Sequence, residues 1–233
     1  MRKATFIITL LTVVYLSLSS CVSIAPVHSS FEKAGTLGKG NVELSGSFSR
    51  YIVGANGESE PINKNLGFRA GYGISDKVDI KLRYENLMLN EKIPDVDFKA
   101  SYFSVIPKVN FIPGRLSLFV PLSMYRFKTV ESGNTYKSSS YSIAPHLIST
   151  FTSKSNTADI SPSLNVEYLF DTEKGSEGSF LMGFNLGAGF SSDLRKWAVR
   201  PEVGYLFKPG EQGHIWNYGI ALQFVLPTGT KSK

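Results

Sequence analysis

From Gly40 onward, apolar and polar residues alternate along the chain in a series of short runs. In the clearest run, Val78, Ile80 and Leu82 occupy one set of alternate positions, and Lys81 and Arg83 occupy the other. A period of two places successive side chains on opposite faces of a β-strand. The alternation predicts ten strands, at 41–51, 65–73, 77–85, 98–110, 115–127, 138–149, 159–170, 179–190, 195–207 and 214–226.

The connections between these runs differ in length. Long connections are expected at 52–64, 86–97 and 128–137, and short ones at 74–76, near 112–114 and at 191–193. Consecutive strands with no helical pattern between them predict an all-β fold, an antiparallel up-and-down β-barrel of about ten strands, with eight as the alternative. Alternation alone leaves the direction of the apolar face open, because a soluble barrel holds it inside and a membrane barrel turns it to lipid.

Strand length and aromatic placement favour the membrane barrel. Strands of about 9 to 13 residues suit a tilted crossing of a bilayer. When the strands are threaded in order, the aromatic residues gather at two levels, as expected for rings at the two headgroup regions. The level at the long connections holds Tyr51, Tyr84, Tyr125, Phe127, Tyr141, Tyr168, Phe170, Phe180, Tyr205, Phe207, Trp216 and Tyr218, and the other holds Tyr72, Phe111, Phe190, Trp197 and Phe224.

The polar faces of the predicted strands carry charges of both signs, which a membrane barrel would hold in its lumen. Because a barrel of eight to ten strands has room for little more than side chains, the preferred interpretation is a structural ion-pair network. An ion path and a ligand pocket are the alternatives. The predicted network comprises Glu43, Arg69, Asp79, Lys81, Arg83, Glu167, Arg200 and Glu202.

The first 20 residues have the organisation of a signal peptide that ends at Cys21. Arg2 and Lys3 precede an apolar stretch, and Leu18, Ser19 and Ser20 lead into the only cysteine of the chain. An apolar segment after basic residues, followed by small residues, is typical of a cleaved export signal. The pattern resembles the lipobox of bacterial lipoprotein precursors, which implies diacylglycerol and acyl groups on Cys21. An ordinary secretory signal and a retained membrane span are the alternatives.

The stretch from Gly40 to Leu226 resembles the small Gram-negative outer-membrane β-barrels in its strand pattern. The resemblance implies an even number of strands with both chain ends on the periplasmic side, anchored in the outer membrane. The expected domains are a signal peptide at 1–20, a lipidated tether at 21–39, the barrel at 40–226 and a C-terminal tail at 227–233. Two features depart from the pattern: a polar tail follows Phe224, and Pro145, Pro162 and Pro201 fall within strands.

Composition removes several classes of function. The formal net charge is +6 at pH 7, and the basic residues are scattered, so no nucleic-acid partner is expected. His28, His146 and His214 lie far apart, with no cysteine or carboxylate at the spacing of zinc ligands. We therefore expect no metal and no cofactor. The expected partner is outer-membrane lipid, and the loops identify no protein partner.

The sequence predicts a lipid-anchored outer-membrane β-barrel with a structural, interaction or minor transport role and no catalysis. The first alternative is a periplasmic lipoprotein whose soluble, lipocalin-like barrel binds a hydrophobic ligand. The second is a lipid-modifying enzyme active at the barrel rim. His146 has Ser142 and Ser149 near it in sequence, but their spacing matches no nucleophile and base pair, so no catalytic residues are predicted.

Overall fold

The computed structural model describes residues 24–55, 57–90, 96–171 and 178–228, in which every regular element is a β-strand. No helix within these ranges is long and apolar enough to cross a membrane. The strands are β1 (Val42–Ala55), β2 (Glu58–Gly73), β3 (Val78–Leu89), β4 (Val96–Ile112), β5 (Leu116–Phe119), β6 (Leu122–Glu131), β7 (Asn134–Ile143), β8 (His146–Ser149), β9 (Phe151–Thr152), β10 (Ala158–Asp171), β11 (Ser179–Phe190), β12 (Trp197–Phe207) and β13 (His214–Leu226).

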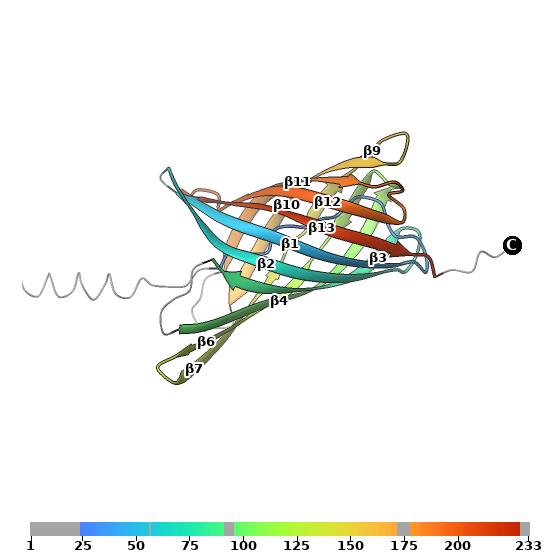
Figure 1. Ribbon diagram of the computed structural model, residues 1–233. Helices are drawn as coiled ribbons and strands as arrows, with labels where there is room; N and C mark the ends of the chain where they lie inside the picture. Colours follow the sequence, from blue (N-terminus) through green and yellow to red (C-terminus); the bar gives the residue numbers. More distant parts are fainter. Residues whose placement is uncertain (1–23, 56, 91–95, 172–177, 229–233) are drawn as a thin grey trace, which may run out of the picture.

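These strands form ten wall strands of a closed barrel (Figure 1). β5 and β6 are two parts of one wall strand, and β7, β8 and β9 are parts of another. Each wall strand pairs antiparallel with its neighbours in sequence, and β1 pairs with β13 to close the barrel. The closing register sets Val42 opposite Leu226. The predicted ten-stranded antiparallel barrel is confirmed.

The two ends of the barrel differ. At one end, here called the hairpin end, β1–β2, β3–β4, β6–β7, β10–β11 and β12–β13 are joined; the opposite end, called the turn end, carries the connections 74–77, 113–115, 153–157 and 191–196. The expected long loops at 52–64 and 128–137 are wrong, because strands occupy most of them. In the β6–β7 hairpin, Ser132 and Gly133 both have positive φ, which matches the twist of a two-residue hairpin turn.

Prolines coincide with gaps in strand pairing. Pro145 falls between β7 and β8, and the pairing of β11 with β12 is interrupted opposite Pro201. Proline has no backbone N–H to donate to a neighbouring strand. Pro162 is tolerated within β10, where it lies opposite Leu186 of β11. The barrel therefore accepts these residues within its wall at the cost of a few ladder hydrogen bonds.

Burial in this barrel is the reverse of burial in a soluble one. Along β3, Asp79, Lys81 and Arg83 are buried, while Ile80 and Leu82 are 38% and 49% exposed. The same division runs round the wall, with polar side chains inside and large apolar ones outside. Most of the predicted aromatic residues lie on the outside or at its edge, but Tyr51 and Tyr125 point into the lumen, because they share the alternate positions of the inward polar residues.

Residues 24–40, here called the lumen segment, run through the inside of the barrel without regular secondary structure. This corrects the expectation of a tether at 21–39 over its described part, 24–39. Ile24 packs at the hairpin end, whereas Val42 and Leu226 pair with each other at the turn end. The predicted signal peptide, Cys21 and residues 229–233 of the tail lie outside the described residues.

Candidate functional site

The lumen segment is held by side chains of the wall instead of by a strand ladder. The amide of Val27 donates to Tyr125 Oη at 2.9 Å, and the amides of His28 and Ser29 donate to Tyr51 Oη at 3.1 and 3.2 Å. A buried amide without a partner is costly, so each irregular residue needs such an acceptor. The remaining bonds of this kind are Ala25 to Asn63, Ser30 and Phe31 to Glu202, Ala34 to Thr150 and Leu37 to Asp79.

The carbonyl groups of the segment are satisfied mainly by cations of the wall. Arg69 donates to the carbonyls of Ser30 and Phe31 at 2.7 and 3.3 Å. Lys108 Nζ donates to the carbonyls of Lys33 and Gly35, both at 2.7 Å. Arg83 donates to the carbonyl of Ser29, and Asn185 donates to that of His28. The wall thus supplies donors and acceptors along the whole buried path of the segment.

Glycines on the inner wall make room for the bulky residues of the segment. A Cβ at Gly183 would lie 2.6 Å from the His28 ring, and one at Gly219 would lie 2.8 Å from the Phe31 ring. Both separations are shorter than any ordinary carbon contact, so a side chain at either position would displace the segment. The β11–β13 wall is therefore shaped around residues 28–31.

Glu32 lies at the centre of the largest charge cluster. Its carboxylate contacts Arg69 at 2.8 Å, Lys81 at 2.9 Å and Lys108 at 3.1 Å. Glu43 of β1 contacts the first two of these cations at 3.0 and 2.9 Å. Every one of these side chains is buried. Charges taken out of water must be paired to be tolerated, so the lumen segment contributes one of the two carboxylates that balance three wall cations.

A second cluster joins three wall strands. Arg200 of β12 makes a two-bonded contact with Asp159 of β10, at 3.0 and 2.8 Å, and its Nε donates to Gln223 of β13 at 2.7 Å. Gln223 in turn donates to Glu43. The planar guanidinium suits a carboxylate that accepts two bonds. Through Glu43, this cluster is continuous with the one around Glu32.

All eight residues of the predicted lumen network are buried on the inner face, at Glu43, Arg69, Asp79, Lys81, Arg83, Glu167, Arg200 and Glu202. Several of these residues bond to groups outside the predicted set instead of to one another. Arg83 pairs with Glu85, while Asp79 and Glu202 accept amides of the lumen segment. Glu167 lies near the hydroxyls of Tyr125 and Ser142.

Sequence reasoning missed Glu32, Glu85, Lys108 and Asp159 as members of the network. Glu85, Lys108 and Asp159 lie on the polar face of predicted strands, so their alternation could have identified them. Glu32 lies in a stretch without periodicity, where no pattern marks its direction. The pattern does not identify Tyr51 and Tyr125 as lumen residues, because aromatic rings at strand ends are typical of the outer face.

The histidines show no catalytic arrangement. His146 is buried, its ring stacks on Phe119 at 4.4 Å between centroids, and the ring of His28 lies 6.3 Å away. His214 stacks on Tyr205 at the hairpin end. Within the described ranges, no group of three or more His, Cys, Asp or Glu residues could hold a metal ion. The small space left beside His28 and His146 is about 10 Å³, roughly that of one water molecule.

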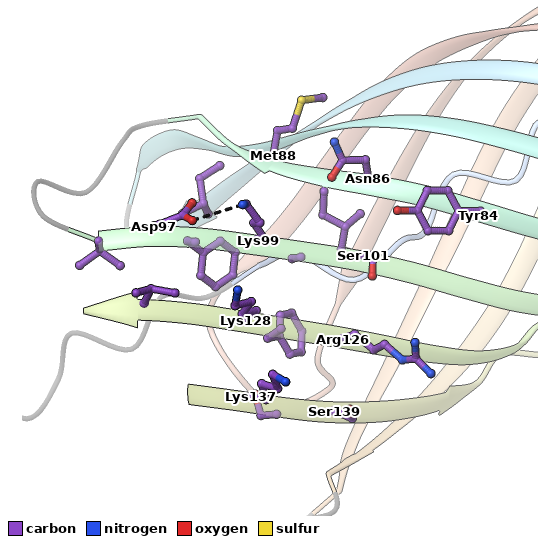
Figure 2. A pocket seen from close by; sticks show the side chains of 18 of the residues that line it. Tyr84, Asn86, Met88, Asp97, Lys99, Ser101, Arg126, Lys128, Lys137 and Ser139 are labelled. Atoms are coloured by element: carbon purple, nitrogen blue, oxygen red, sulfur yellow. Dashed lines mark ion pairs between the residues drawn. The ribbon is translucent and has the colours of Figure 1, made fainter. Parts of the chain in front are cut away.

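An open groove lies at the hairpin end, along β3, β4, β6 and β7 (Figure 2). Lys99, Lys128 and Lys137 line it from adjacent strands, and the register places Lys128 directly opposite both of the others. Lys99 also pairs with Asp97 at 3.3 Å. Like charges directly opposite one another on a sheet repel, so this row of three lysines destabilises the outer surface of the strands that carry it.

Comparison with known proteins gives structural relatives only. No protein-family model and no curated protein sequence matches the chain. The translocator domain of the autotransporter NalP from Neisseria meningitidis superposes with a TM-score of 0.52 at 10% identity, over 80% of this chain and 88% of that one. The β domain of the Bordetella autotransporter Brka gives a TM-score of 0.50 at 13% identity, over 80% and 99% of the two chains.

Neisserial surface protein A also matches, with a TM-score of 0.41 at 13% identity, over 80% of this chain and 99% of that one. At such identities the likeness concerns the fold. For the two autotransporter domains, whose TM-scores are 0.50 or higher, the shared fold is a closed antiparallel barrel. The chain therefore has the fold of the Gram-negative outer-membrane β-barrels.

Proposed function

We propose that this protein is a lipid-anchored outer-membrane β-barrel, closed by its own lumen segment, with a structural or interaction role. The observation that carries the proposal is the reversed burial of the wall. Ile80 and Leu82 face outward at mid-strand, and similar residues surround the barrel. A continuous apolar belt of this kind would be unstable in water and suits the hydrocarbon of a bilayer.

The arrangement of the lumen argues against a lipocalin-like carrier. Such a carrier needs an apolar pocket inside its barrel, whereas the inner wall here is lined by charged and amide side chains. The lumen segment fills the space that a ligand would need, and its backbone is bonded along most of its length. The same filling argues against transport unless the segment leaves. A structural or interaction role is therefore preferred to a transport role.

The lipid anchor is part of the same proposal and has its own test. Cys21 ends the signal pattern and is the only thiol of the chain. Intact mass of the mature protein should correspond to a chain beginning at Cys21 and carrying a diacylglycerol and a further acyl group. A mature chain with a free Cys21 thiol would remove the anchor from the proposal and leave the barrel untouched.

The membrane-spanning barrel is tested without the lipid. Residues 1–20 are replaced by an ordinary cleavable signal peptide, and Cys21→Ser removes the acylation site. The barrel should still fractionate with the outer membrane, resist extraction by carbonate and urea, and require detergent to dissolve. Recovery of this variant as a soluble periplasmic protein would contradict the proposal and favour the ligand-binding alternative.

A further inference from the structure

The lumen segment crosses the full length of the barrel. At one end, Ile24 packs against a buried cluster that includes Leu87 and Ala100, which lie near the hairpin end of β3 and β4. At the other end, the amide of Leu37 bonds Asp79, and Thr36 Oγ1 donates to the carbonyl of Asp76 at 2.7 Å, both at the turn end. The chain then turns back into β1 at Val42.

The wall surrounds the segment on nearly all sides. Its hydrogen-bond partners come from β1 to β6 and from β10, β11 and β12, among them Tyr51, Arg69, Lys108, Ser117, Asn165 and Glu202. A segment that merely rested in the mouth of the barrel would contact one rim only. This one is enclosed from residue 25 to residue 37, so the two ends of the segment lie on opposite sides of whatever membrane the wall spans.

Resting on the proposed function, we infer that the mature N-terminus is displayed on the cell surface, having crossed the outer membrane through the barrel's own lumen. In outer-membrane barrels the longer connections face outward and the short turns face the periplasm. Here the connections at the two ends are similar in length, but the β6–β7 hairpin extends beyond the wall at the hairpin end (Figure 1), and Ile24 lies at that same end. We assign this end to the cell surface.

This path also fixes the leaflet that a lipid on Cys21 would enter. Ile24 is three positions after Cys21 in the chain, a reach of about 10 Å even when fully extended. The hydrocarbon core of a bilayer is about 30 Å thick. A lipid on Cys21 would therefore lie in the outer leaflet, on the side opposite to Leu226. This replaces the periplasmic anchor that the sequence alone suggests.

Three tagged versions of the full chain test the inference. A short epitope is inserted between Val22 and Ser23, at the tip of the β6–β7 hairpin between Ser132 and Gly133, or after Lys233. Should the insertion at 132 prevent assembly, Gly210 in the β12–β13 connection offers a second site at the same end. Antibody binding is measured on intact cells and again after the outer membrane is permeabilised.

We expect the N-terminal and hairpin tags to bind as much antibody on intact cells as after permeabilisation, and the C-terminal tag to bind only after permeabilisation. Labelling of the hairpin tag with protection of the N-terminal tag would overturn the inference while the barrel and its orientation stand. Labelling of the C-terminal tag alone would overturn it by inverting the barrel. Protection of all three tags in a soluble periplasmic protein would instead remove the proposed function.

Discussion

At the scale of single residues, Glu32 is the side chain on which the lumen depends most. It alone belongs to the lumen segment and touches three buried cations of the wall, Arg69, Lys81 and Lys108. The cost of burying these cations is offset only while their carboxylates remain. Glu43 is the other carboxylate of the cluster and reaches two of the three.

Glu32→Gln should therefore lower the free energy of unfolding by roughly 3 to 5 kcal/mol, the usual loss when one partner of a buried ion pair is removed. The double variant Glu32→Gln with Lys108→Gln should recover part of this loss, because it removes one of the stranded charges. Denaturant titration in detergent measures both, with exposed Glu211→Gln as the control. Strictly additive losses in the double variant would argue against a coupled cluster.

For the row of lysines at the hairpin end, we expect removal of a charge to raise the stability of the protein. Lys128 faces Lys99 and Lys137 across two strand pairs, so Lys128→Gln removes two repulsive contacts. We expect the free energy of unfolding to rise by about 0.2 to 1 kcal/mol in low salt. The gain should shrink as salt is added, because exposed charges are screened. A loss of stability, or a gain that salt does not change, would contradict this account.

At the scale of elements, the lumen segment lies inside the wall and bonds to it along its length without being a strand. Its amides bond to the hydroxyls of Tyr51 and Tyr125 and to carboxylates of β3 and β12. Such bonds each contribute about 0.5 to 1.5 kcal/mol, but leaving a buried amide without an acceptor costs about 1 to 3 kcal/mol. Removing an acceptor while the segment stays buried should therefore cost more than the hydrogen bond itself contributes.

Tyr51→Phe removes the acceptor shared by the amides of His28 and Ser29, while the ring keeps its volume. The free energy of unfolding should fall by about 1 to 3 kcal/mol, and the amides of His28 and Ser29 should exchange hydrogen faster than they do in the unmodified protein. The matched control is Tyr84→Phe, whose ring lies on the outer face and is 51% exposed. Equal exchange in both variants would mean that Tyr51 does not hold the segment.

At the scale of the whole molecule, the sequence was sufficient to predict the strands of the wall but not the segment that fills the lumen. Alternation identified all ten wall strands, because a half-buried strand imposes a period of two wherever its faces meet different surroundings. It also placed Arg69, Lys81 and Arg200 on the polar face of their strands, and strand length together with aromatic placement assigned that face to the lumen. The predicted strand bounds are too short at the hairpin end, where β1 continues to Ala55 and β2 begins at Glu58.

The lumen segment could not be predicted by the same reasoning. Its backbone bonds go to side chains far away in the sequence, such as Glu202 for Ser30, so they leave no local period. The available signal was indirect: glycines such as Gly183 and Gly219 stand at inward positions of their strands. These glycines mark the space that His28 and Phe31 occupy, but nothing in the sequence states what fills that space.

The central claim is that the outer face of this barrel meets lipid. A small fluorescent probe on Ile80→Cys, in a Cys21→Ser background, tests it most directly, with Lys128→Cys as the control on the outer face at the hairpin end. We expect brominated lipids to quench the probe at position 80 and a water-soluble quencher to leave it unchanged, with the reverse at position 128. Shielding at 80 from both quenchers, in a protein that stays in solution without detergent, would contradict the membrane barrel.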